Sequence, residues 1–202
     1  MDPIVSLIKA HNPDAILMQE MHDLTFEQLK KRIRTEYPFS YGFFPKRPAQ
    51  GQVLFSKRPI TVINKQMHHV SFTHEGHDIN LIGVHFPSPR SGSSIQKAEY
   101  ELISTARYIR GAVEDKPFIV AGDMNSAYWH PRLLDFITRI GIGPVTIPVL
   151  SWPSYIPVLL QIPIDYIFTS QHLCILSSER GEASGSDHFP VIATFVLCNA
   201  NK

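Results

Sequence analysis

The sequence predicts an α/β fold, because short apolar segments of strand length alternate with longer segments of helical periodicity along the chain. Its 202 residues are 44% hydrophobic, which is enough for one sizeable core and favours a single domain over residues 1–202. No internal repeat, linker or low-complexity tract divides the chain. We therefore expect one globular domain in which strands and helices alternate.

Each element follows from a local pattern. Helices are expected where apolar residues recur at helical spacing, as Phe26, Leu29 and Ile33 do, and Pro131 and Gly141 bound the last helix in the preferred order. Strands are expected where short apolar runs end on polar residues. In chain order we expect a helix in 2–13, a strand in 14–20, a helix in 25–37, strands in 51–72 and 77–86, a helix in 94–113, a strand in 117–125, a helix in 130–141, and strands in 164–170 and 191–197.

The composition limits the classes of function. A net charge of +1 does not suit a strongly basic nucleic-acid-binding protein, so any phosphate chemistry must rest on a local site. Cys174 and Cys198 are too few for a disulfide framework and leave their redox state and the compartment open. No apolar run reaches the length of a membrane span and no signal-peptide pattern is present, so the chain as given is expected to be soluble.

Polar side chains gather where the apolar strands end or begin. Ligand sites of α/β proteins collect at strand ends, because side chains and loops converge there. Such a concentration of acids, histidines and an amide in one small domain favours a shared site over chance. The residues are Glu20, His85, Asp123, Asn125, Asp165, Asp187 and His188.

These residue types favour phosphoester hydrolysis. Carboxylates from separate strands repel one another unless a cation neutralises them, and oxygen-rich ligand sets favour Mg²⁺ or Mn²⁺ over zinc. A histidine beside a carboxylate titrates near neutrality and can be fixed in one tautomer. A divalent metal, an aspartate that orients water and a histidine that meets developing charge together suit attack on a phosphorus atom.

The motifs resemble those of the endonuclease/exonuclease/phosphatase (DNase I-like) superfamily. Over residues 13–197, DAILMQEM, GQVLFSKRPI, GVHFPSP, VAGDMNS, PIDYIFTS and GSDHFPVIATF occur in the order expected of that superfamily. The loop SWPSYIPVLLQIPIDYIF is most similar to an uncharacterised bacterial branch, whose members often carry membrane helices before the catalytic domain. The chain could then be the soluble domain of a membrane-tethered bacterial protein.

The resemblance implies a fold, a cofactor and residue roles. The fold is a four-layer sandwich of two mixed β-sheets flanked by helices, and the cofactor is Mg²⁺ or Mn²⁺. Glu20 and Asp187 would contact the metal, and Asp123 would position and deprotonate the attacking water. Asn125 would donate to a phosphate oxygen. Asp165 would hold His188, and His188 would stabilise the charge that develops at phosphorus. His85 would touch the phosphate or assist the leaving oxygen.

One departure from the superfamily pattern concerns the N-terminus. Superfamily members normally begin with a strand that carries a metal-binding asparagine, whereas this chain starts at Met1 inside the following helix. A missing interior strand would leave backbone groups of a sheet unpaired, which is costly. We therefore expect an N-terminally truncated domain.

The function expected is a divalent-metal-dependent phosphoesterase, first of all a phosphodiesterase or nuclease. The alternatives are a phospholipid or phosphoinositide head-group hydrolase, and a catalytically impaired pseudoenzyme that binds a phosphate ligand or a partner. The expected substrate is a phosphoester, in nucleic acid or a phospholipid head group, and we expect a monomer without a stable protein partner.

Structural readings of the same residues stay open. Asp187-His188 could be a polar turn, Asp123 and Asn125 an Asx turn, and Asp165 an acid paired with arginine or lysine. Glu20 could be solvated and His85 a satisfied histidine at the core edge, while Trp152 and Tyr155 could form a substrate wall or simply pack within their loop. The histidines around the turn before residue 77 favour a solvated hairpin over a zinc site; they are His68, His69, His74 and His77.

Overall fold

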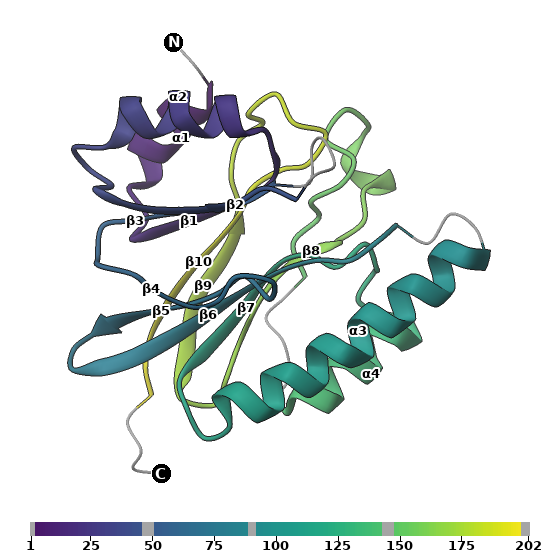
Figure 1. Cartoon of the computed structure of the whole chain (residues 1–202). Helices are drawn as coiled ribbons and strands as arrows, with labels where there is room; N and C mark the ends of the chain where they lie inside the picture. Colours follow the sequence, from purple (N-terminus) through teal and green to yellow (C-terminus); the bar gives the residue numbers. More distant parts are fainter. Residues whose placement is uncertain (1–2, 46–50, 89–91, 143–147, 199–202) are drawn as a thin grey trace.

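The computed structural model describes residues 3–45, 51–88, 92–142 and 148–198. Figure 1 shows pairs of helices on opposite outer sides of two layers of strands. The elements in chain order are α1 (Pro3–His11), β1 (Ala15–Met21), α2 (Asp23–Ile33), β2 (Phe39–Phe43), β3 (Gly51–Ser56), β4 (Thr61–Asn64), β5 (His69–His74), β6 (His77–His85), α3 (Gly92–Val113), β7 (Phe118–Asp123), α4 (Pro131–Ile140), the 3₁₀ turn η1 (Val158–Leu160), β8 (Asp165–Thr169), β9 (Leu173–Arg180) and β10 (Val191–Leu197).

One layer is a five-stranded mixed sheet in the order β4-β5-β6-β7-β8. Strands β6 and β7 are parallel, and the long helix α3 makes the crossover between them, while every other pair in this sheet is antiparallel. Helices α3 and α4 cover its outer face (Figure 1). Apolar side chains of these helices and strands, among them Ile109, Val120 and Phe136, form the largest buried cluster.

The second layer consists of two antiparallel sheets, β1-β3-β2 and β10-β9. Helices α1 and α2 cover the first of them, with Phe26, Ile33 and Phe55 in the shared core. Leu17 of β1 and Phe195 of β10 pack against the same cluster as Ile119 of β7, which joins the two layers. The predicted α/β sandwich with outer helices is confirmed.

Strands β1 and β10 share that inter-layer cluster, yet each pairs along one edge only. Within the described ranges, β1 bonds to β3 and β10 bonds to β9, and their other edges carry no strand. Open edges of this kind leave backbone donors and acceptors without ladder partners. The expectation of a truncated domain with a missing strand stays a prediction.

Strands β2 and β9 were not expected from the sequence. Strand β9 has four apolar residues, Leu173–Leu176, followed by four polar ones, Ser177–Arg180, and much of it is exposed, so neither an alternating pattern nor a long apolar run marks it as a strand. It carries Cys174, which forms a disulfide with Cys198 just after β10. In the described part of the chain, no helix is both long enough and apolar enough to cross a membrane.

Candidate active site

Neighbouring strands of the five-stranded sheet bring three predicted site residues into one row. His85 ends β6 and pairs in register with Asp123, which ends the parallel strand β7. Asp123 in turn pairs with Asp165, the first residue of the antiparallel strand β8. Because residues paired in register lie on the same face of a sheet, their side chains point to a common region.

His188 joins this row from the turn before β10. Its Nδ1 lies 2.7 Å from Oδ2 of Asp165. Although burial lowers the pKa of His188, the hydrogen bond to Asp165 and the surrounding carboxylates outweigh it and raise that pKa to about 9. The imidazole is therefore protonated at neutral pH, and its Nε2–H is left to donate elsewhere.

The turn that carries His188 is held in place by the segment before β8. The amide of Phe189 donates to the carbonyl oxygen of Ser151 over 2.8 Å, and the amide of His188 donates to Oγ of Ser186 over 3.1 Å. The buried Ser151 hydroxyl also accepts from the amide of Asp165 over 3.2 Å. Ser151 thus fixes both partners of the Asp165–His188 pair, a role that no sequence pattern signalled.

Asp123 is the most buried acid of the site, with 7% of its surface exposed. Its carboxylate accepts hydrogen bonds from Asn125, from the backbone N–H over 2.6 Å and from Nδ2 over 2.7 Å. Asn125 can close this turn because it adopts a positive φ of 46°, which asparagine tolerates. Burial first, and then the nearby charge of Asp165, raise the pKa of Asp123 to about 7.

Glu20 reaches the row from the other layer. It lies near the end of β1 with a φ of 55°, and its Oε1 is 3.6 Å from Nε2 of His85. The same His85 nitrogen lies 3.9 Å from Oδ2 of Asp123. Burial lowers the pKa of His85 despite the carboxylates around it, so this imidazole is neutral at pH 7.

Asp187 faces the loop that precedes β8. Its Oδ2 accepts from Nε1 of Trp152 over 3.4 Å, and its backbone oxygen accepts from the amide of Ser154 over 2.8 Å. Its side chain is exposed, and its charge contributes to the raised pKa of the adjacent His188. The Trp152 ring also lies near that of His188, with ring centroids 6.5 Å apart, so Trp152 borders the site.

Gln19, which the sequence patterns did not single out, connects the two layers at the site. Its Oε1 accepts from the amide of Asp123 over 2.9 Å, and its Nε2 donates to the carbonyl oxygen of Val84. The side-chain amide thus lies between the ends of β6 and β7. Gly122, at a φ of 136°, makes room, because a Cβ there would collide with both the Val84 oxygen and the Gln19 amide. A polar residue inside an apolar strand, directly before Glu20, was the only available signal.

Comparison with known proteins identifies the family. A model described as "Endonuclease/Exonuclease/phosphatase family" matches residues 1–188. The chain belongs to this family. Members of the endonuclease/exonuclease/phosphatase family are metal-dependent phosphoester hydrolases, and the site described above occupies the matched region. No curated protein sequence gave a significant match.

Solved structures share the fold at low sequence identity. An endonuclease/exonuclease/phosphatase from Beutenbergia cavernae aligns with a TM-score of 0.74 at 17% identity, covering 99% of this chain and 67% of that one. An AP endonuclease from Archaeoglobus fulgidus gives 0.74 at 15% identity, covering 96% and 93%. A mutant beta toxin from Staphylococcus aureus with bound magnesium ions gives 0.71 at 17% identity, covering 95% and 90%.

The donor atoms of the site are of the kind that binds a hard divalent cation. The Glu20 and Asp187 carboxylates are exposed and have no lysine or arginine among their described contacts. Burial first, and then the negative charge of Asp165, raise the pKa of Asp123. The described residues form no group of three or more histidine, cysteine or acidic side chains that could hold a metal. Mg²⁺ commonly uses only one or two carboxylates and completes its shell with water and substrate phosphate, so Glu20 and Asp187 suit such an ion by the kind of donor atom that they carry.

The histidines around the β5–β6 hairpin correct one expectation. His74 and His77 do lie at the hairpin, but His69 is buried, with 1% of its surface exposed, and its ring nitrogens contact Tyr108 Oη at 2.8 Å and Asn80 Oδ1 at 2.9 Å. Burial lowers the pKa of His68 to about 4. A solvated hairpin is therefore wrong for His68 and His69, because β5 enters the core there.

Proposed function

We propose that this chain is a divalent-metal-dependent phosphodiesterase in which Asp123 activates the attacking water. The observation that carries the proposal is the row of His85, Asp123 and Asp165 at the ends of neighbouring strands, which His188 joins through its 2.7 Å contact with Asp165. Within this row the pKa of Asp123 is raised to about 7. A general base works best when its pKa lies near the working pH, because it is then largely ionised yet still accepts a proton readily. Burial and the neighbouring Asp165 provide this tuning.

The remaining residues would act on the phosphoryl group. Water attacks phosphorus, its proton passes to Asp123, and the bond from phosphorus to the leaving oxygen breaks. His188, protonated through its contact with Asp165, is a charged donor for the oxygens on which negative charge develops. His85, kept neutral by burial, is an uncharged donor toward the phosphate or the leaving oxygen.

Asn125 contacts the base and could also contact the phosphate. Its Nδ2 already donates to Asp123 and to the carbonyl oxygen of Phe86, at 2.7 and 2.9 Å. In this state it orients the base, and contact with a phosphate oxygen would require one of these bonds to give way. A cation held by Glu20 and Asp187 would neutralise the acids and the phosphate and polarise the phosphoryl oxygens.

The test is hydrolysis of bis(4-nitrophenyl) phosphate with Mg²⁺ or Mn²⁺ and with EDTA. We expect metal-dependent release of nitrophenolate, and losses of roughly 10²- to 10⁴-fold in Asp123→Ala and His188→Ala, the range for removed acid–base groups. His77→Ala and Glu27→Ala alter an exposed histidine and an exposed acidic residue outside the site and serve as controls.

Two results would overturn the proposal. One is near wild-type turnover in both site variants, which would show that the residue roles are wrong. The other is the absence of any metal-dependent hydrolysis together with no Mn²⁺ binding by calorimetry, which would favour the pseudoenzyme.

A further inference from the structure

An exposed apolar loop stands beside the site and takes no part in the chemistry proposed above. We define the apolar loop as residues Tyr155–Leu160. Of its side chains, Tyr155 is 74% exposed, Val158 49%, Leu159 92% and Leu160 66%. Scattered exposed apolar residues are normal on a protein surface, but a contiguous group marks an interaction site.

The apolar loop is ordered by its own hydrogen bonds. The amides of Leu160 and Gln161 donate to the carbonyl oxygens of Pro157 and Val158, over 2.9 and 3.1 Å, which closes the turn η1. The Gln161 side chain donates to the carbonyl oxygen of Ile156 over 2.8 Å and accepts from Arg180 over 2.8 Å. The exposed leucines therefore sit on a defined turn whose polar backbone groups are in part satisfied internally, which lowers the cost of entering an apolar medium.

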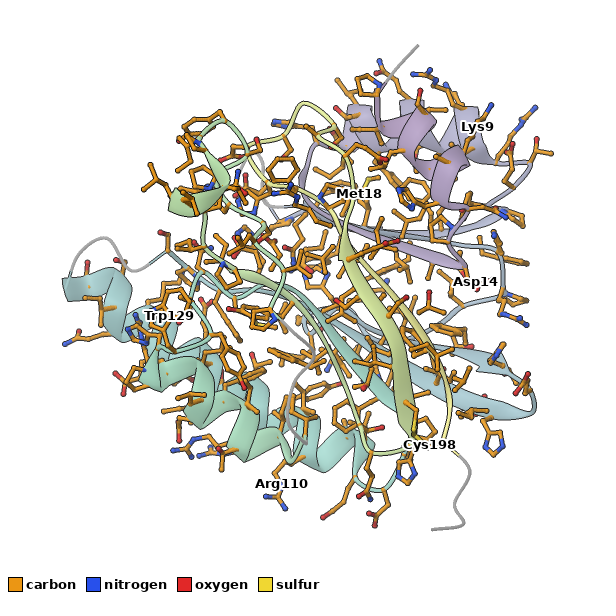
Figure 2. All side chains as sticks on the ribbon, turned by 180° about the vertical axis from the view of Figure 1, so that it is seen from behind. Lys9, Asp14, Met18, Arg110, Trp129 and Cys198 are labelled. Atoms are coloured by element: carbon orange, nitrogen blue, oxygen red, sulfur yellow. A yellow bond between two sulfur atoms is a disulfide. The ribbon has the colours of Figure 1, made fainter. Side chains whose placement is uncertain are left out.

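The base of this loop is joined to the turn that carries the site. The amide of Ser154 donates to the Asp187 backbone oxygen over 2.8 Å, and its hydroxyl donates to the carbonyl oxygen of Ser186 over 2.7 Å. Figure 1 shows η1 in green next to the yellow segment before β10, and Figure 2 shows the same region from behind with side chains projecting outward from the turn. Whatever the loop docks on is thus held next to Asp187 and His188.

The composition of the loop identifies the kind of surface. No charged residue occurs from Pro148 to Ile164, so nothing in this stretch would attract a nucleic-acid backbone. Leucine and valine are under-represented among the residues that dominate protein–protein binding, where tryptophan, tyrosine and arginine prevail. Aliphatic side chains at a tip, with the aromatic rings of Tyr155 and Trp152 toward its base, are typical of segments that enter the membrane–water interface.

We infer that the apolar loop docks this protein on a lipid surface and that the substrate phosphate is a phosphodiester of a lipid head group. The inference of a lipid substrate rests on the proposed function. Docking through Leu159 and Leu160 would bring the turn of Asp187 and His188 to the plane of the head groups.

Vesicle binding tests the docking step without turnover. The full chain in EDTA is sedimented with phosphatidylcholine vesicles, and the bound fraction is compared with that of the double variant Leu159→Ser/Leu160→Ser. Each leucine contributes enough apolar area that we expect the partition coefficient to fall at least about tenfold. Leu24→Ser/Leu176→Ser is the matched control, since these leucines are 74% and 63% exposed on α2 and β9, outside the loop.

Three results would overturn the docking step: no binding by the wild type, equal loss in the control pair, or dimerisation of the wild type in sedimentation velocity that the loop variant abolishes. The last would make a second copy of the chain the occupant.

The substrate half is tested separately. The loop variant should hydrolyse bis(4-nitrophenyl) phosphate within about twofold of wild type, while release of phosphorylated head groups from vesicles of phosphatidylcholine, phosphatidylglycerol and sphingomyelin falls about tenfold or more, in line with lost binding. Vesicle binding without hydrolysis of either substrate would uphold docking and reject the phosphodiesterase. Hydrolysis of the small substrate without any head-group release would uphold the phosphodiesterase and reject the lipid substrate.

Discussion

Replacing Asp123 by asparagine should make the metal-free protein more stable at pH 8 while removing its activity. Asp123 is nearly fully buried, and burial together with Asp165 raises its pKa from 3.8 to about 7. Its ionised form is therefore unfavourable in the folded state. Asparagine has nearly the same shape and carries no charge.

The sign and size follow from linkage. Below pH 3.8 the Asp123 carboxyl is protonated in the folded and in the unfolded protein, so it contributes nothing. Between pH 3.8 and about 7 it is ionised in the unfolded chain but still protonated in the folded protein, so the free energy of unfolding falls as the pH rises. At about 1.4 kcal/mol per pH unit, the full effect above pH 7 is at most about 4 kcal/mol. Asn125 donates twice to this carboxylate, and the variant loses one acceptor, at a cost of about 1 kcal/mol.

Urea unfolding in EDTA, followed by tryptophan fluorescence, measures the difference. We expect the stability advantage of Asp123→Asn over wild type to grow by about 2–3 kcal/mol between pH 5 and pH 8. Asp78→Asn is the control, because Asp78 is exposed and its bond from Thr73 survives the change. An advantage that does not vary with pH, or a variant less stable than wild type at pH 8, would refute the reasoning.

Three further changes test the surrounding structure. Asp165→Asn removes the partner that raises the pKa of His188, so an NMR titration should find that pKa well below about 9; an unchanged value would contradict the contact. Gln19→Ala should lower kcat about tenfold with little change in KM, because the bond to the amide of Asp123 is lost. Gln19→Glu should move the rising limb of the pH–rate profile to higher pH, because it places a second negative charge beside the base. An unshifted pH profile, or a fall in kcat that only matches a fall in the folded fraction measured by circular dichroism, would contradict this role. Cys174→Ser/Cys198→Ser should cost about 3 kcal/mol in chemical unfolding, since the bridge closes a segment of 24 residues, and an unaltered midpoint would argue against the disulfide.

The sequence was sufficient for the α/β class and for the row of site residues, because each of them ends or begins an apolar run. His85, Asp123 and Asp165 meet in register for that reason. From the residues alone, an arginine or lysine partner for Asp165 stayed open as an alternative to His188, since no local pattern shows which turn of the chain lies beside the start of β8.

Other features lay beyond pattern reasoning because they depend on contacts between layers. Gln19 occupies its strand like any polar residue, and its value appears only when β1 meets the ends of β6 and β7. Strand β9 is apolar only in its first half and largely exposed, so neither its pairing with β10 nor the Cys174–Cys198 bridge could be predicted from the sequence. The burial of His69 could not be predicted for the same reason, because the histidines near the hairpin are distinguished only by how deeply each lies in the folded protein.

The central claim is that Glu20, Asp123 and His188, from distant parts of the chain, act on one phosphoryl group beside one divalent cation. Anomalous diffraction from crystals soaked with Mn²⁺ and inorganic phosphate tests it directly. The account predicts a manganese peak bound by the Glu20 carboxylate, with a phosphate between it and the Asp123 and His188 side chains. A manganese peak on an unrelated surface, with that region left without phosphate, would contradict the account.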